Sequence, residues 1–120
     1  MEHVDGLIEA LKARGFTFSE QRRLDGHQFT FAIFTDVTVQ AGPHVGKLLQ
    51  RLAIPIPDDS MLPPPGIHTV PHLAVIGQKN VHASPLGPEW AYWSRPIAGF
   101  RPAQGVARIV SHVLSIFRDA

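Results

Sequence analysis

The first hydrophobic pattern along the chain has the period of an α-helix. Val4, Leu7, Ile8 and Leu11 fall at positions i, i+3, i+4 and i+7, with charged residues placed between them. Gly15 follows the last of these apolar positions, where helices commonly end. The spacing predicts a short amphipathic helix that buries one face.

The pattern changes to a period of two in the next part of the chain. Every second residue from Phe29 to Val39 is aromatic or β-branched, which predicts a half-buried strand. Residues 16–24 are expected to form the strand before it, with a turn at Asp25-Gly26. These two segments predict the first half of an antiparallel meander.

The meander is expected to continue after a turn at residues 41–46. Residues 47–54 alternate less cleanly and predict a third strand. Its inner face is expected to hold Leu48, Leu52 and Ile54. The stretch Ile54–Gly66 contains five prolines, which predict a stiff extended connection without ladder or helix. Residues 67–76 then predict a last short strand, interrupted at Pro71.

The chain closes with a second helical pattern, which begins at Pro102. Its apolar positions form a broad stripe at helical spacing: Val106, Ile109, Val110, Val113, Leu114 and Phe117. The order of elements predicts an α+β fold with an N-terminal helix, an antiparallel four-stranded meander, an irregular loop and a C-terminal helix. Residues 1–120 are expected to form a single domain.

Composition narrows the classes of function. The formal net charge is only +1, with basic residues scattered along the chain, which argues against a nucleic-acid groove. The chain has no cysteine, which excludes disulfides and thiolate metal sites. Its start has neither the basic leader nor the apolar run of a signal peptide, and no apolar stretch is long enough for a membrane span. We therefore expect a cytoplasmic protein that binds neither nucleic acid nor membrane.

The irregular segment Asn80–Pro96, NVHASPLGPEWAYWSRP, concentrates residues that carry chemistry. Together with its neighbours it resembles the plan of ubiquitin-conjugating enzymes. AGPHVGKLLQRLAIPIPDDSMLPPPG is similar to that family's glycine-proline turn, third strand and proline-rich bend, and WAYWSRPIAGFRPAQGVARIVSHVLSIF is similar to its tryptophan segment and crossover helix. The resemblance runs from about Gly26 to the C-terminus and is greatest with prokaryotic, cysteine-poor branches of the family.

This resemblance implies a bacterial carrier protein with that family's fold. Such a carrier accepts a ubiquitin-like protein from an activating enzyme and passes it to an amine of a target protein. The setting that the resemblance implies is a defence or stress operon, such as one for phage defence. The expected surface for an activating enzyme is the first helix with the loops of the meander.

Two departures from the family concern its catalytic machinery. The His-Pro-Asn triplet is absent, and the nucleophilic cysteine is missing. The position of that cysteine falls within residues 80–84, where Ser84 is the one side chain able to form an acyl intermediate. Alternatively, Ala83 or Ser84 is a replacement for a native cysteine. A serine needs a base within hydrogen-bond reach. If the segment is extended, His82 points to the same side as Ser84.

If the segment turns instead, His72 or His68 is the better base. Asn80 or backbone amides are expected to hold the oxyanion. The competing interpretation is structural, because Ser-Pro is a common turn dipeptide. Three histidines could also bind zinc, but His68 and His72 are separated by a proline in an extended segment without an accompanying carboxylate. We therefore expect no metal and no cofactor.

The remaining candidate residues are expected to bind rather than to react. Trp90 and Trp93 are predicted to lie in the core or in the wall of a groove. Arg95 is expected to pair with a carboxylate, either of the loop or of a bound C-terminal tail.

Two functions follow from these residues. The preferred one is an oxyester carrier of a ubiquitin-like protein, with Ser84, His82 and Asn80 in catalytic roles. The alternative is a catalytically inactive conjugating-enzyme variant that binds a ubiquitin-like protein or a partner enzyme noncovalently.

Overall fold

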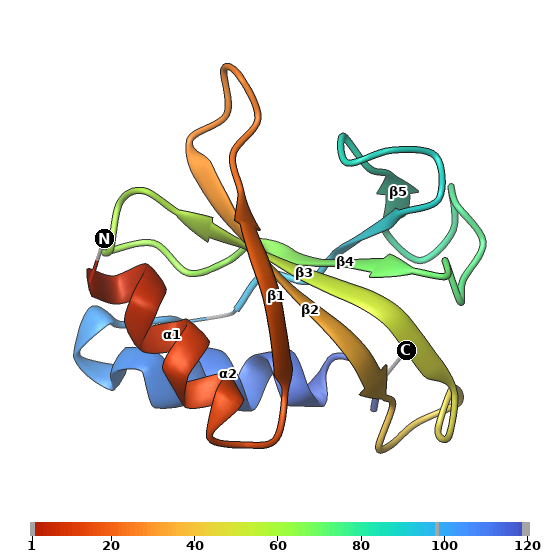
Figure 1. Ribbon diagram of the computed structural model, residues 1–120, viewed down its shortest axis with the longest axis horizontal. Coiled ribbons are helices and arrows are strands. Elements are labelled where there is room, and N and C mark those ends of the chain that lie inside the picture. The colour runs from red at the N-terminus through yellow and green to blue at the C-terminus, as the bar shows by residue number, and fades with distance from the viewer. Residues whose placement is uncertain (1, 98, 119–120) are drawn as a thin grey trace.

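Two helices lie side by side against one face of a twisted antiparallel sheet in the computed structural model, which describes residues 2–97 and 99–118 (Figure 1). The six strands follow the order β1-β2-β3-β4-β6-β5. The elements in chain order are α1 (Glu2–Lys12), β1 (Thr17–Arg22), β2 (Phe29–Thr38), β3 (Leu48–Pro57), β4 (Gly66–Val70), β5 (Val81–Ala83), β6 (Ala91–Ser94), a 3-10 turn (Pro102–Gln104) and α2 (Gly105–Ser115). The predicted α+β class is confirmed. None of the described helices is long and apolar enough to cross a membrane.

Helix α1 buries the apolar stripe that its sequence predicts. Val4, Leu7, Ile8 and Leu11 are all buried and join the core between the helices and the sheet. Gly15 follows the helix with a φ of +92°, a left-handed conformation that glycine adopts without steric cost. Because each buried aliphatic side chain stabilises the fold by roughly 1.5–3 kcal/mol, this stripe accounts for the helix better than intrinsic propensity does.

The sheet has six strands, so the predicted four-stranded meander is wrong. The two additional strands, β5 and β6, come from the segment that was expected to be an irregular loop, and β6 pairs with both β4 and β5. They contain only three and four residues. Runs this short, separated by prolines, have no readable period in the sequence. Their pairing partners decide that they are strands.

Strand β3 continues into the proline-rich stretch, where no ladder was expected. Its pairing with β2 runs on to Pro57, opposite Phe29, whereas its pairing with β4 ends at Ala53. Beyond Ala53 one side of β3 is therefore an edge. Proline is tolerated there because its missing N–H can face the unpaired side. The prediction of an irregular connection is correct only for residues 58–65.

The middle of β2 is buried on both faces, although a half-buried strand was predicted. Ala32 and Phe34 face the helices, while Phe31 and Ile33 belong to a second core cluster with Trp90 on the opposite face. That second cluster lies under the segment between β5 and β6. The segment predicted to be an irregular loop therefore covers one face of the sheet.

Leu48 is 51 % exposed, so its predicted place on the inner face of the third strand is wrong. Its neighbour Leu49 is buried instead. The ladder between β2 and β3 omits Asp36, whose φ of +55° is left-handed. The register is the same on both sides of Asp36, but the pairs Phe34–Leu52 and Val37–Leu49 both pack in the core on the helix side. The two strands therefore change their alternation together at Asp36, which puts Leu49 rather than Leu48 in the core.

Helix α2 buries a narrower stripe than predicted. Val110, Val113 and Phe117 are buried, together with Ile116, whereas Leu114 is 40 % exposed. Residues three and four apart share a helix face, and Leu114 lies at the border of that face, where it lines a hollow against β2. The predicted helix is confirmed, and the inward position of Leu114 is corrected.

Candidate functional site

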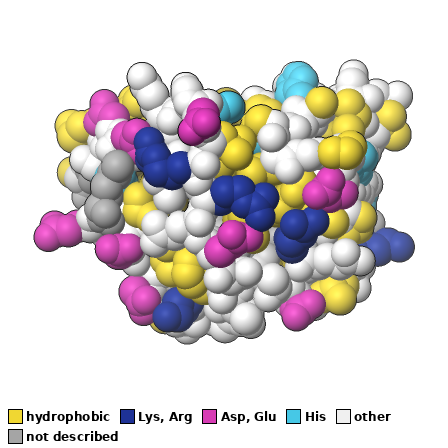
Figure 2. All heavy atoms as spheres, turned by 45° about the horizontal axis from the view of Figure 1, so that its top comes forward, with side chains coloured by type: hydrophobic (Ala, Val, Ile, Leu, Met, Phe, Trp, Pro, Cys, Tyr) yellow, Lys and Arg dark blue, Asp and Glu magenta, His cyan; other side chains and the backbone are white. Residues whose placement is uncertain are grey.

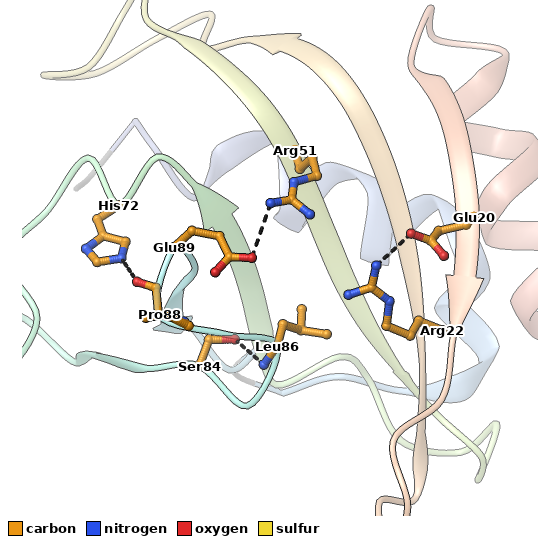
Figure 3. Close-up of polar contacts among 8 residues, drawn as sticks. All are labelled: Glu20, Arg22, Arg51, His72, Ser84, Leu86, Pro88 and Glu89. Atoms are coloured by element: carbon orange, nitrogen blue, oxygen red, sulfur yellow. Dashed lines mark hydrogen bonds and ion pairs between the residues drawn. The ribbon is translucent and has the colours of Figure 1, made fainter.

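Ser84 lies directly after β5, where the chain turns to cross the sheet. Its side chain is half-buried, and its Oγ accepts a hydrogen bond from the Leu86 N–H at 3.1 Å (Figure 3). A hydroxyl that bonds the backbone two residues ahead is a common turn-forming contact. The Oγ also lies 2.8 Å from Nδ1 of His68. Ser84 is therefore engaged on two sides by the protein itself.

His68 occupies a buried position in the centre of β4. It is 3 % exposed, stacks on Tyr92 with ring centroids 4.7 Å apart, and meets the Phe31 ring edge-on at 5.2 Å. Burial lowers the pKa of His68 from 6.5 to about 4, because a charged imidazolium loses its hydration there. At neutral pH the ring is uncharged. One nitrogen of a neutral imidazole carries a hydrogen and can donate, and the other can only accept.

His82 lies on the far side of Tyr92 and does not reach Ser84. It is exposed, pairs with Tyr92 across β5 and β6, and its ring centroid is 6.0 Å from that of Tyr92. The described contacts include no hydrogen bond between His82 and Ser84. Because the chain turns at Ser84 and does not remain extended, the imidazole brought to the hydroxyl is that of His68.

Asn80 contributes its main chain to the structure. It is exposed, with a left-handed φ of +57°, and its carbonyl oxygen accepts the Ser94 N–H at 3.0 Å and Arg95 Nη1 at 3.4 Å. No contact between the Asn80 side chain and Ser84 is found among the described residues. The structure therefore groups Asn80 with Arg95, away from the Ser84 hydroxyl.

The two tryptophans lie on opposite faces of the sheet and are both buried. Trp90 packs in the cluster under the segment 84–90, with the Arg51 guanidinium 4.7 Å above its ring. Trp93 belongs to the core on the helix side, and its Nε1–H donates to Thr69 Oγ1 at 3.1 Å. The Nε1–H of Trp90 is buried without a partner among the described residues. Both tryptophans are core residues, which is one of the two positions predicted for them; the other was the wall of a groove.

Arg95 lies over Trp93, with its guanidinium 5.4 Å from the ring centroid. No carboxylate of the described residues forms an ion pair with it, so the predicted pairing with the loop does not occur there. Glu89, in the segment before β6, lies 3.4 Å from Arg51 instead (Figure 3). On β1, Glu20 lies 2.7 Å from Arg22 (Figure 3).

His72 helps to hold the covering segment in place. Its Nε2–H donates to the Pro88 carbonyl at 2.9 Å (Figure 3). This contact ties the end of β4 to the segment that leads into Trp90. His68 and His82 both lie against Tyr92, and His72 bonds Pro88. No group of three metal-ligating side chains occurs within residues 2–97 and 99–118.

Two hollows in the described surface lie away from Ser84. One, of about 530 Å³, lies between β2 and the end of α2, and the other, of about 240 Å³, lies between the turn 41–46 and the segment 71–80. Figure 2 shows basic, acidic and hydrophobic side chains interspersed on the face that it draws. Ser84 lines neither hollow.

Two arrangements around Ser84 and Trp93 appear only in the structure. Tyr92 separates His68 from His82, and Thr69 binds Trp93. Both depend on the pairing of β4 with β6. The only signal in the sequence was the aromatic, β-branched content of these two short runs.

Comparisons with protein-family models, curated proteins and solved structures found no match to this chain.

Proposed function

We propose that this chain is a ubiquitin-conjugating-enzyme-like module that binds a ubiquitin-like protein or its partner enzyme noncovalently. The order of sequence motifs supports membership of that family. We also propose that the chain has the fold of that family and that it works in the cytoplasm. The observation that carries the noncovalent function is the environment of the Ser84 hydroxyl, which bonds the Leu86 N–H and a buried histidine.

The acid-base chemistry favours a structural hydroxyl. For acyl transfer, the Ser84 Oγ would attack the activated carbonyl carbon of the ubiquitin-like protein, and the Ser84 proton would pass to His68. The bond from that carbon to the activating enzyme would break, and the enzyme's group would leave with the bonding electrons and take up the proton. A general base works best with a pKa near the operating pH, and burial holds the pKa of His68 at about 4. Forming an imidazolium in this apolar environment is costly. The Leu86 N–H also occupies one of the lone pairs of the oxygen.

The second candidate is the oxyester carrier, and one contact favours it. The 2.8 Å separation between Ser84 Oγ and His68 Nδ1 is within the reach of a nucleophile and its base. In this mechanism His68, not His82, is the general base for Ser84. The carrier would transfer the ubiquitin-like protein from its activating enzyme to a target amine.

A charging assay separates the two functions. The native protein, Ser84→Ala and Ser84→Cys are each incubated with a ubiquitin-like protein, its matched activating enzyme and ATP, and are then analysed by intact mass. Hydroxide and reductant serve as separate quenches. Noncovalent binding to the ubiquitin-like protein is measured by calorimetry in parallel.

The binding module predicts no adduct on the native protein and equal noncovalent binding by the native protein and Ser84→Ala. Ser84→Cys tests whether the position is accessible, because a thiol needs less help from a base than a hydroxyl. A native adduct that survives reductant, dissolves in base and is lost in Ser84→Ala would establish the carrier and reject the binding module.

A further inference from the structure

The hollow between the turn 41–46 and the segment 71–80 has a distinct chemical character. Its volume is about 240 Å³. Its lining includes Pro43, His44, Val75, Lys79, Trp93 and Arg95. Two of these side chains are cationic, and the lining contains no Asp or Glu. The hollow therefore combines positive charge with an apolar wall.

Arg95 is fixed in position by its surroundings. Its Nη1 donates to the Ser94 carbonyl at 2.8 Å and to the Asn80 carbonyl at 3.4 Å, and its guanidinium lies over Trp93. The Arg95 carbonyl in turn accepts a 2.6 Å hydrogen bond from His112 Nε2–H on α2. A guanidinium held in this way loses little conformational entropy when it binds an anion.

Lys79 brings a second cation to the same hollow. It is exposed on the turn before β5, where Lys79 and Asn80 both adopt left-handed φ values, of +49° and +57°. Backbone hydrogen bonds from Gly77 N–H to the Val81 carbonyl and back from Val81 N–H to the Gln78 carbonyl close this turn. Within residues 2–97 and 99–118, neither Lys79 nor Arg95 has a carboxylate within ion-pair distance.

Apolar side chains border the two cations. Val75, which lines the hollow, is 62 % exposed. Ile76 and Val45, which are the chain neighbours of the lining residues Val75 and His44, are 41 % and 60 % exposed. Trp93 closes the floor from the core side. An exposed aliphatic side chain in the lining of a cationic hollow favours the binding of an apolar group next to an anion.

We propose that this hollow binds the free C-terminal carboxylate of an extended peptide whose last residues are apolar. The carboxylate binds Arg95 and Lys79, and the adjacent side chains contact Val75 and Trp93. Its volume falls below the roughly 300–1,000 Å³ of sites for whole small molecules, which fits the end of a chain. This inference is independent of Ser84 chemistry and of whether the partner is ubiquitin-like.

The test uses three probes and the full chain labelled with 15N. The probes are the acetylated tetrapeptide Ala-Leu-Leu-Val with a free carboxylate, the same peptide with a C-terminal amide, and sodium acetate. Two-dimensional NMR titrations give the affinity and the residues that respond. We expect the peptide with a free carboxylate to shift the backbone N–H signals of Val75, Lys79 and Arg95. The amidated peptide should bind at least about tenfold more weakly, because a charge-assisted contact is lost.

Substitutions of Lys79 and Arg95 test whether these two cations bind the carboxylate. Lys79→Gln is at an exposed position and is expected to weaken binding of the acid about threefold to tenfold, while Arg95→Gln has the larger effect because its guanidinium can bind bidentately. Lys12→Gln makes the same change of charge on α1 and should leave the affinity unaltered. The proposal is overturned if acid and amide bind equally, if acetate binds as tightly as the peptide, if the shifts lie outside the hollow, or if the acid causes no shift at millimolar concentration.

Discussion

Replacing His68 with Asn tests how the buried imidazole couples to the stability of the fold. Asn retains a polar group near the position of Nδ1, so the contact with Ser84 has a replacement, but it does not titrate. The native protein and the variant then differ in one titrating group inside the core. Their difference in free energy of unfolding is expected to depend on pH.

The magnitude and the sign follow from the two pKa values of His68. Burial lowers its pKa from 6.5 to about 4. Between these values the unfolded chain binds a proton at His68 that the folded chain does not, so acid favours unfolding. The full difference corresponds to about 3 kcal/mol. The native protein has the full contribution above pH 6.5 and loses it progressively as the pH falls to about 4.

The assay is urea unfolding of both proteins at several pH values, followed by tryptophan fluorescence. The native protein should lose about 3 kcal/mol more than His68→Asn between pH 7 and pH 4. The titration of the His68 ring protons, followed by NMR below the onset of unfolding, measures the folded pKa directly. A difference between the two proteins that stays constant with pH, or a His68 ring that titrates above pH 6, would refute the reasoning.

Two further predictions concern packing around β6. A Cβ added at Gly66 would lie 1.9 Å from the Trp93 carbonyl oxygen. Gly66→Ala should therefore lower the free energy of unfolding by about 3 kcal/mol or more, measured by thermal or urea unfolding. In the control Gly6→Ala the nearest atom is 3.9 Å from the added Cβ, and the substitution should stabilise α1 by about 0.5–1 kcal/mol. Equal effects of the two alanines would contradict this account. Trp93→Phe breaks the hydrogen bond to Thr69, whereas Trp90→Phe removes an N–H that has no partner among the described residues, so the first should cost about 1–2 kcal/mol more. The same urea titrations check that order, and a larger loss for Trp90→Phe would reverse the assignment.

The sequence by itself determined the parts of the fold in which a pattern repeats. Four apolar residues at helical spacing predicted α1, and ten residues with alternating character predicted β2. The closing helix was predicted from the same kind of periodicity. These elements are long enough for a period to be read, and burial of their apolar side chains is the main free energy that forms them. The alternation in β2 predicted the strand but not the burial of its middle on both faces.

Tertiary structure alone decided the short strands and the arrangement around Ser84. Three residues of β5 and four of β6 have no period, and they form strands because β4 offers an edge with which β6 can pair. That pairing places His68 beside Tyr92, and the turn after β5 brings Ser84 to His68. The two residues are sixteen positions apart in the chain. The low pKa of His68 arises in the same way, because it depends on burial by β2 and β6, and desolvation is a property of the packed protein rather than of the residue.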